Sequence, residues 1–564
     1  MTAGRDPTEE RQGPRPGTTF AGSGRHAMLV GAGILLSRIA GLIRQRVFAH
    51  FFGASAAADA FAAAFRIPNV LQNLFGEGVL SASFIPVYAG LLARGDKQAA
   101  DRVARGVFAL LGLLMAVLVL LGVLFAPVLV TLIAPGFAGS VRELTIRLVR
   151  ILFPSTGLLV LSAWCLGVLN SHRRFFLSYV APVVWNAAMI TSMIAFGGER
   201  AEELAVILAW AAVAGSLLQI AVQAPVVLRL LRARAGAVPA PGSSGPSVKD
   251  RLSGGVRTVA RNFVPVFIGR GVVQISAYVD ELLATLLPTG SVASLVYAQL
   301  LYMLPVSLFG MSVSAAELPA MSGAVGIGER IAEELRARLA TGLRRIAFFV
   351  VPSAVALLTL GDLIAGALYQ TGRFTQGHSV WIWGILAAYA VGLVATTMGR
   401  LYSSTFYALG DTRTPLRFAI VRVALGIGLG FVFALHAPRA LGLDPRWGVA
   451  GIALASALAG WLEFGLLRRA LSVRIGASGF AARTFALILG ASLAGAAAAW
   501  AVRLASGSLP HAIAPGAPGT PAPALHPILA AGMALAPFGA IYLALTAWAG
   551  IPEVGRVRRR LLRR

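Results

Sequence analysis

The chain has 564 residues but a single cysteine and few charged side chains. Because Cys165 stands alone, no intrachain disulfide can form, which excludes a disulfide-stapled fold. Only 13% of the residues are charged, whereas 57% are hydrophobic and the mean hydropathy is +0.77. No soluble fold could bury so much apolar surface. The composition therefore predicts a membrane protein, and the 63 glycines agree, because glycine is commoner in membrane helices than in soluble ones.

The sequence also lacks the patterns of the enzymes that act at membranes. It has no P-loop that would bind ATP. An enzyme acting on a polyprenyl phosphate, such as a glycosyltransferase or phosphatase, needs paired carboxylates with a metal or a nucleophilic histidine. Asp280 and Glu281 are the only adjacent acids inside a predicted span, and the seven histidines do not cluster with them. We predict a transporter rather than an enzyme, with no catalytic residue, no metal and no cofactor.

Fourteen apolar segments are long enough to cross a hydrocarbon core, which needs about 20 residues per helix. They lie near residues 27–50, 57–93, 106–133, 147–170, 175–197, 204–228, 262–288, 291–321, 346–370, 380–408, 415–437, 447–467, 484–506 and 527–550. The second segment is interrupted by Pro68 and Pro86, and the eighth by Pro305 and Pro319. Broken membrane helices are tolerated where freed backbone groups face protein or a wet cavity. We therefore predict that these two segments line the transport pathway.

The distribution of lysine and arginine predicts the orientation. Of the 49 basic residues, 34 lie on one side of the predicted spans, 7 on the other and 8 inside them. The positive-inside rule assigns the richer side, which holds both termini, to the cytoplasm. The net charge of +26 is then explained by topology and by attraction to anionic lipid, and nucleic acid is not an expected partner. We expect residues 1–26 to be a disordered cytoplasmic tail and not a signal peptide.

Two halves of the chain repeat each other. Pro68, LFG at residues 74–76 and SASFIP at 81–86 recur as Pro305, LFG at 308–310 and SAAELP at 314–319. Six spans in each half begin on the cytoplasmic side, so the repeat is parallel, an arrangement typical of alternating-access transporters. The predicted fold is an all-α polytopic membrane protein. Its predicted parts are an N-lobe (27–232), a cytoplasmic linker (233–257), a C-lobe (258–471), two extra helices (472–552) and a basic cytoplasmic tail (553–564).

Charged side chains inside the spans are the candidate binding residues, because an arginine at mid-depth costs roughly 2.5 to 3.5 kcal/mol. Arg38 lies close to the midplane of the first span. Gly41 would allow a bend that brings Arg44 toward the same cavity. In the second span Asp59, Arg66 and Asn73 recur every seven residues and therefore share one helix face.

Several of these charges also have a structural interpretation. Arg46 and Asp59 lie near the outer ends of adjacent spans and could form an ion pair. Glu77, between two glycines, could be a hinge carboxylate or a helix cap. With Gly41, Pro68 and Pro305 it is a candidate gating or hinge residue. The side chains near helix ends could instead reach toward the membrane surface: Arg150, Arg400, Arg422 and Glu463.

Residues 37–87 (SRIAGLIRQRVFAHFFGASAAADAFAAAFRIPNVLQNLFGEGVLSASFIPV) resemble the N-terminal signature of the MurJ (MviN) family, the lipid II flippases of bacterial peptidoglycan synthesis. Further similarities are IAPGF at 133–137, YQTGRFT at 369–375 and FYALGDTRTP at 406–415. The resemblance covers roughly residues 28–470. It implies a two-lobed transporter of the multidrug/oligosaccharidyl-lipid/polysaccharide superfamily in the bacterial cytoplasmic membrane. Its cationic cavity would take the diphosphate and sugars of lipid II, and its last two helices would form a groove for the polyprenyl tail.

The resemblance also implies roles for individual residues. Arg38 and Arg44 match the family's first-span cavity arginines, and Asp59 matches its second-span aspartate. Arg66 stands where the family also carries a basic residue. The implied partners are lipid II and membrane lipids. Proteins of cell-wall synthesis are further candidates, and we expect a monomer.

This chain departs from the family pattern at two phosphate-binding positions, where Gln72 and Leu300 replace arginines. Arg270 lies near mid-depth in the seventh span, at a depth comparable to Leu300. We hypothesise that Arg270 supplies the missing charge, and the alternative is an ion pair with Asp280 or Glu281.

The predicted function is therefore translocation of lipid II by alternating access, with the diphosphate bridging the lobes through Arg38, Arg44 and Arg270. A flippase for another undecaprenyl-linked glycan and a transport-inactive scaffold remain alternatives, the latter because of Gln72 and Leu300. A cationic-drug exporter would need an acidic cavity, and this one is predicted to be basic.

Overall fold

The computed structural model describes residues 20–172, 174–232, 257–259, 261, 263, 278–322, 329–506 and 526–555. In these ranges all regular structure is helical, which confirms the predicted all-α class. Eleven helical runs among them are long and apolar enough to cross a membrane. The seventh predicted span falls mostly outside the described residues, so the count of fourteen stays a prediction.

The first half of the chain forms one lobe, the N-lobe. Its helices are α1 (Phe20–Phe52), α2 (Ala56–Phe75), α3 (Glu77–Ala93), α4 (Lys97–Leu124), α5 (Ala126–Ile133), α6 (Gly139–Ser171), α7 (Phe175–Ala195) and α8 (Ala201–Arg232). The long helix α6 packs against α2, α4 and α8 and is largely buried. Helix α1 packs on α7.

The second half forms the C-lobe. Its elements are α10 (Ser291–Pro305), the π-helix η1 (Val306–Met311), α11 (Ser312–Ser322), α12 (Glu329–Tyr369), α13 (Gln376–Ala408), α14 (Arg413–Phe431), the π-helix η2 (Val432–His436), α15 (Ala437–Ala440), the 3₁₀ turn η3 (Pro445–Trp447) and α16 (Gly448–Ile475). Helices α17 (Ala482–Ala505) and α18 (Pro527–Trp548) follow. Helix α13 packs against α12 and α16, and α17 and α18 pack on α12.

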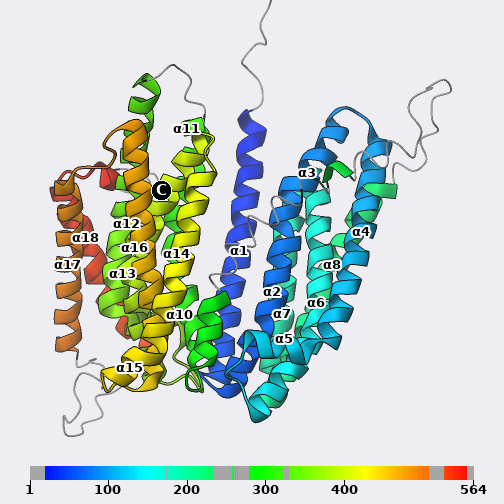
Figure 1. The fold of residues 1–564 in the computed structure, drawn as a ribbon, viewed down its shortest axis with the longest axis horizontal. Helices are drawn as coiled ribbons and strands as arrows, with labels where there is room; N and C mark the ends of the chain where they lie inside the picture. Colours follow the sequence, from blue (N-terminus) through cyan, green and yellow to red (C-terminus); the bar gives the residue numbers. More distant parts are fainter. Residues whose placement is uncertain are drawn as a thin grey trace, which may run out of the picture.

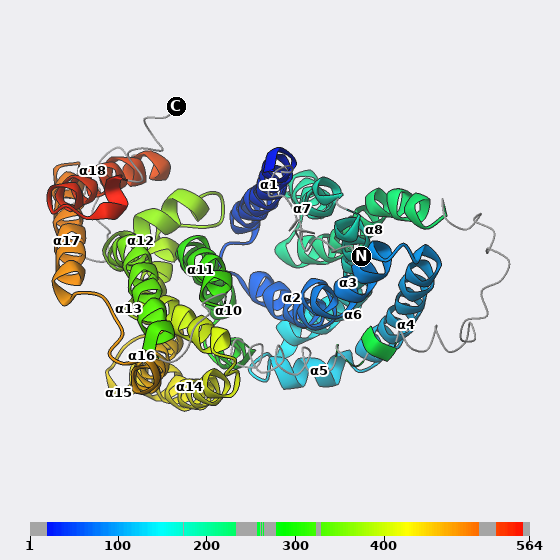
Figure 2. The same cartoon turned by 90° about the horizontal axis from the view of Figure 1, so that it is seen from above.

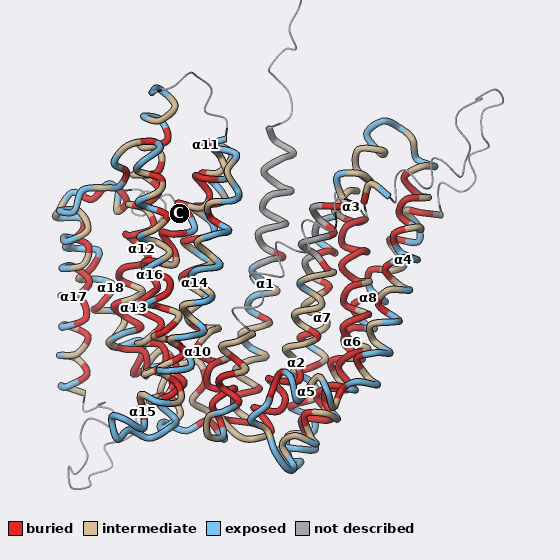
Figure 3. The backbone as a smooth tube through the Cα atoms, viewed as in Figure 1, coloured by how far each residue is buried: buried red, intermediate tan, exposed pale blue. Residues whose placement is uncertain are grey.

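The two lobes meet at one end of the molecule and diverge toward the other (Figure 1). We call the first end the apex, where the α1–α2 turn meets the start of α10 and the α12–α13 turn. Seen from above, α1 lies between the lobes, and α17 and α18 lie on the far flank of the C-lobe (Figure 2). Buried residues fill the interior of each lobe and the apex (Figure 3).

The outer surfaces of the lobes are apolar. Helix α4 exposes Leu113, Leu120 and Leu124, and about 60% or more of the surface of each side chain is accessible. Helix α14 exposes Ile420 and Val421. Large exposed aliphatic surface of this kind is expected where helices face lipid. This pattern agrees with a protein that spans the membrane.

The prediction that prolines break the second and eighth spans is wrong. Pro68 lies inside α2 and Pro86 inside α3, and the chain breaks between these helices at Gly76. The Gly76 N–H donates to the Gln72 carbonyl, and a Cβ at Gly76 would lie 2.3 Å from that oxygen, so only glycine fits. In the repeated LFG, Gly310 lies inside the π-helix η1, which follows Pro305 without interrupting the helix. The first LFG therefore lies at a break between two helices, and the second lies in a π-helical turn. Turns of the latter kind are common at functional sites.

A buried ion pair attaches α17 to the C-lobe. Arg503, which is 1% exposed, contacts Asp362 of α12 through both of its terminal nitrogens, one of them at 3.1 Å from Oδ1. The Trp500 ring lies 4.9 Å from the Arg503 guanidinium, and its indole N–H donates to the Thr359 carbonyl.

Candidate functional site

Asp59 of α2 joins the two lobes at the apex. It is 3% exposed, and its carboxylate accepts hydrogen bonds from the backbone N–H of Gly290 at 2.6 Å and of Ala293 at 2.8 Å. Gly290 precedes the first residue of α10 with a φ of +90°. A carboxylate from the N-lobe therefore caps the N-terminus of a C-lobe helix, where unpaired N–H groups and the helix dipole favour negative charge.

The end of α1 makes the complementary contact. Arg46 donates to the carbonyls of Ala367 and Leu368, in the last turn of α12, at 2.6 and 2.9 Å. A cation at a helix C-terminus is stabilised by the same dipole. The His50 carbonyl accepts from the Arg373 N–H at 2.8 Å, and its ring lies 2.8 Å from the Thr371 hydroxyl. The alternative of an Arg46–Asp59 ion pair is wrong, because each of these residues binds the backbone of the opposite lobe.

Glycines allow the lobes to approach closely at the apex. A Cβ at Gly136 would lie 2.0 Å from the carbonyl oxygen of Thr285 in the C-lobe. A Cβ at Gly372 would lie 2.4 Å from the His50 carbonyl, and one at Gly53 would lie 2.7 Å from the Arg373 carbonyl. Gly136 belongs to IAPGF and Gly372 to YQTGRFT. Two segments that carried the family resemblance without an assigned role therefore form the contact between the lobes.

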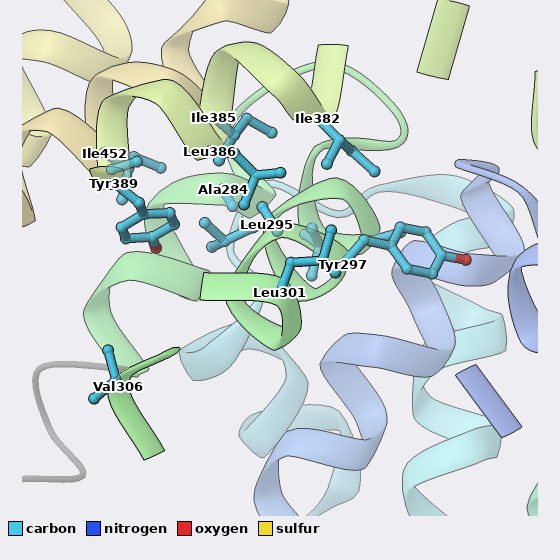
Figure 4. Close-up of a cluster of buried hydrophobic side chains, with 14 of the residues drawn as sticks. Ala284, Leu295, Tyr297, Leu301, Val306, Ile382, Ile385, Leu386, Tyr389 and Ile452 are labelled. Carbon is cyan, nitrogen blue, oxygen red and sulfur yellow. The ribbon is translucent and has the colours of Figure 1, made fainter. Parts of the chain in front are cut away.

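Tyr297 of α10 adds an aromatic contact. In Figure 4 its side chain points away from the aliphatic residues of α13 and toward the N-lobe helices. Its hydroxyl donates to the Gly53 carbonyl at 2.9 Å, and its ring lies 6.3 Å from that of Phe48. The Tyr369 hydroxyl donates in turn to the Tyr297 carbonyl. The contact between the lobes at the apex, which we call the seam, is therefore buried and hydrogen-bonded.

Arg66 lies further along α2 and also reaches the C-lobe. Its Nε lies 3.1 Å from Oε2 of Glu281, and both side chains are largely buried. The seven-residue spacing predicted that Asp59, Arg66 and Asn73 share a face. Asp59 and Arg66 do point to the same partner lobe, whereas the exposed Asn73 contacts Asn69 of its own helix.

Arg38 lies on α1 toward the diverging end and is exposed. Its guanidinium donates to the Ser307 hydroxyl at 3.1 Å, and Ser307 belongs to the π-helix η1 of the opposite lobe. A neutral hydroxyl leaves the charge of Arg38 uncompensated at this contact. Among Arg38, Arg44 and Arg66, Arg38 is the exposed one.

Arg44 points in a different direction. Its guanidinium lies 5.0 Å from the centre of the Trp185 ring and 3.8 Å from the sulfur of Met189, both on α7. Helix α1 is continuous through Gly41. Arg44 packs within the N-lobe, whereas Arg38 reaches η1 of the C-lobe, so the two arginines have different partners.

The remaining candidates are placed as follows. Arg270 and the side chain of Glu77 lie outside the described residues, so their roles stay predictions. Pro305 immediately precedes η1, and Pro68 is buried inside α2. Arg422 forms an ion pair with Glu463, at 3.1 Å within the C-lobe. Throughout the described part of the chain, no three His, Cys, Asp or Glu side chains come close enough to hold a metal ion.

Sequence reasoning missed several cross-lobe partners. The partners of Asp59 and Arg46 are backbone groups, which carry no residue signature. Glu281 was named only as a possible partner of Arg270, and the structure pairs it with Arg66. Gly290 had a usable signal, since a glycine in a short connection between spans favours a positive φ before a helix.

Comparison with known proteins agrees with this architecture. The family model described as lipid II flippase MurJ matches residues 48–515. A probable lipid II flippase MurJ of Rhizobium tropici is 33% identical over 444 residues, which cover 77% of this chain and 78% of the relative. The lipid II flippase MurJ of Burkholderia cenocepacia is 31% identical over 398 residues, covering 70% and 75%.

Solved structures show the same fold. A lipid II flippase MurJ in an inward closed conformation superposes with a TM-score of 0.71 at 23% identity and covers 92% of this chain and 99% of its own. An inward-facing multidrug transporter of the MATE family gives a TM-score of 0.61 at 18% identity, covering 79% and 98%. The family model spans most of the chain, and the relatives exceed 30% identity over more than two thirds of it. This chain therefore belongs to the MurJ family of lipid II flippases.

Proposed function

We propose that this chain carries lipid II from the inner to the outer leaflet of the bacterial cytoplasmic membrane by alternating access. The observation that carries the proposal is the contrast between a sealed apex and lobes that diverge at the other end, where Arg38 is exposed. A transporter that opens to one side at a time needs one closed and one open end. The family membership makes lipid II the expected cargo.

The orientation follows from the excess of lysine and arginine on one side of the spans. By the positive-inside rule, the diverging end, both termini and the linker would lie in the cytoplasm. The conformation described is then inward-facing, with the apex closed toward the outside. Lipid II, which is made in the cytoplasmic leaflet, would enter between the diverging lobes.

The binding group with the best support is Arg38. Its planar guanidinium can bind phosphate oxygens with two parallel hydrogen bonds and keeps its charge in an apolar setting. Ser307, its present partner, is a neutral hydroxyl that a diphosphate would displace. Arg66 and Arg270 are the further proposed cationic contacts, and Arg44 contributes positive potential from its position against α7.

The cycle would proceed by breaking the apex bonds. Most of them join a side chain to backbone N–H or carbonyl groups of the other lobe, and water can replace such partners once the seam opens. Binding of an anion between the lobes supplies the differential affinity for two states that a conformational shift requires. Helices α17 and α18, on the flank of the C-lobe, are the proposed groove for the polyprenyl tail.

The alternatives are less well supported. A flippase for another undecaprenyl-linked glycan and a transport-inactive scaffold are not favoured, because the family model and the relatives agree on lipid II. The seam of reversible hydrogen bonds is also what a working transporter needs.

Complementation tests this proposal. The chain should rescue a bacterial strain depleted of its own lipid II flippase, and the Arg38→Ala variant should fail at equal membrane abundance. The matched control is Arg150→Ala, which removes an exposed arginine from α6. Failure of the parent chain to rescue despite normal membrane insertion, or rescue by Arg38→Ala, would overturn the proposal.

A further inference from the structure

The ion pair between Arg66 and Glu281 is the one charged side-chain pair that joins the two lobes among the pairs found in the described residues. The Arg66 and Glu281 side chains are 18% and 7% exposed, respectively. The pair is therefore almost dry, a setting in which separating the charges is costly.

The pair also lies at the depth expected for the cargo's diphosphate. Arg66 is about 15 Å along α2 from its apex end, at ~1.5 Å per residue. Leu300, where the resemblance leads us to expect an arginine, is about 14 Å along α10 from its apex end by the same measure. Because Gln72 and Leu300 are neutral, Arg66 is the cation that α2 supplies at this depth.

The geometry of the pair leaves room for a better partner. Within the described chain, neither Arg66 Nε nor Glu281 Oε1 has a well-aligned hydrogen bond, although both atoms are buried. The contact is thus an ion pair at 3.1 Å and not the bidentate fork that arginine forms with its best anions. A diphosphate has more acceptor oxygens than one carboxylate and can satisfy the guanidinium more fully.

We propose that Glu281 is an internal competitor for the anionic cargo, which holds Arg66 and keeps the lobes together until a diphosphate displaces it. The inference rests on the proposed function. When the diphosphate takes Arg66, Glu281 is left as a buried carboxylate without its cation. Because an unpaired buried charge is strongly unfavourable, Glu281 must move to water or to another donor, which separates its segment from α2. Cargo binding is thereby coupled to opening of the apex.

A purely structural ion pair makes a different prediction. If Arg66 and Glu281 only join the lobes, removing either charge breaks the same contact and changes cargo affinity in the same direction. If Glu281 competes with the cargo, the two changes have opposite signs. Glu281→Gln should raise the affinity for lipid II by several-fold to about tenfold, because the competing carboxylate is gone. Arg66→Gln should lower it by about tenfold or more, because a charged donor to the diphosphate is lost.

The test measures binding of lipid II to the purified full-length protein by native mass spectrometry. The Arg66→Gln/Glu281→Gln double variant should bind like Arg66→Gln alone, because competition requires both partners. Glu463→Gln is the matched control, since Glu463 pairs with Arg422 at the same 3.1 Å but within one lobe. The affinity of Glu463→Gln for lipid II should equal that of the parent.

A second readout follows the apex directly. Spin labels at Arg200 and Arg439, exposed residues of the two lobes, report the apex distance in a Cys165→Ser background. Glu281→Gln should shift this distance toward the open form without cargo. Equal signs for the two single variants, or an unchanged affinity in Glu281→Gln, would overturn the inference. Failure of the parent itself to bind lipid II would instead count against the proposed function.

Discussion

Two buried aspartates show how the molecule separates its permanent contacts from its reversible ones. Asp362 lies within the C-lobe and is paired with the equally buried Arg503 of α17. Asp59 lies between the lobes and accepts from the backbone N–H groups of Gly290 and Ala293. Two oppositely charged side chains that leave water together are costly to separate. A carboxylate at a helix N-terminus can exchange its partners for water.

The comparison extends to the other charged residues. Arg344 of the C-lobe pairs with the buried Glu553, so the residues after α18 are tied to α12. Across the lobes, Arg46 binds carbonyl groups and Asp59 binds N–H groups. The helices that must stay together are joined by ion pairs, and the lobes that must part are joined mainly by bonds to backbone.

The largest expected effect is on the permanent contact. Asp362→Asn leaves Arg503 buried without its counter-ion and should cost about 3 to 5 kcal/mol of stability, as for other broken buried pairs. Thermal unfolding of the purified protein in detergent, followed by intrinsic fluorescence, should show a clear fall in Tm. The distance between labels at Arg200 and Arg439 should not change. A Tm equal to that of the parent would mean that the pair is not a permanent support.

The contact of Asp59 between the lobes should show the reverse pattern, in which the apex distance changes and Tm does not. Asp59→Ala removes two hydrogen bonds to a charged acceptor, whose partners water can replace once the seam opens, and should shift the lobes toward the apex-open form with little change in Tm. Asp444→Ala is the matched control, because Asp444 accepts from the Arg446 N–H at 2.8 Å within one lobe. If both variants leave the apex distance unchanged, Asp59 does not hold the seam.

A smaller effect is expected from the close glycine contact. The methyl group of Gly136→Ala would meet the Thr285 carbonyl oxygen at 2.0 Å. Overpacking of this kind costs about 1 to 3 kcal/mol, and the apex can relieve it by opening. Gly112→Ala on α4 adds the same methyl group where nothing lies within 4 Å. An apex distance that responds equally to both variants would show that close approach at Gly136 is unimportant.

The smallest effect concerns a contact at the diverging end. Hydrogen bonds from the Thr414 backbone N–H and hydroxyl, with a further contribution from Arg474, lower the pKa of Asp411 from 3.8 to about 2. Because the folded pKa is the lower one, the ionised carboxylate stabilises the fold above pH 4, and this contribution disappears as the pH falls toward 2. Asp411→Asn should therefore melt below the parent at pH 7 and converge with it near pH 2. A pH-independent difference would contradict this assignment.

The sequence predicted the features that depend on local periodicity. Apolar length identified helices that are long enough to cross a membrane, whereas the bounds of the two lobes stay a prediction. The seven-residue spacing of Asp59 and Arg66 correctly placed both on one face, because a straight helix fixes that relation locally. The break between α2 and α3 was misassigned to prolines, since membrane helices accommodate proline when neighbouring groups satisfy the freed carbonyls.

The features that the sequence could not predict depend on how helices that are distant in the chain pack together. Arg66 and Glu281 are far apart along the chain, and nothing in either local sequence indicates the pairing between the lobes. The direction of Arg44 depends on packing inside the N-lobe, where α1 lies against Trp185 and Met189 of α7. Backbone partners such as the Gly290 N–H are invisible to any search for complementary side chains.

Transport by purified protein tests the central claim most directly. Vesicles containing the parent chain should move fluorescent lipid II between leaflets. Arg38→Ala should reduce the initial rate by about tenfold or more, as expected for loss of a charged hydrogen bond to the diphosphate, while Arg38→Lys should retain part of the rate. Equal rates in the parent and Arg38→Ala would contradict the account, because the exposed guanidinium between the lobes would then have no role in carrying the cargo.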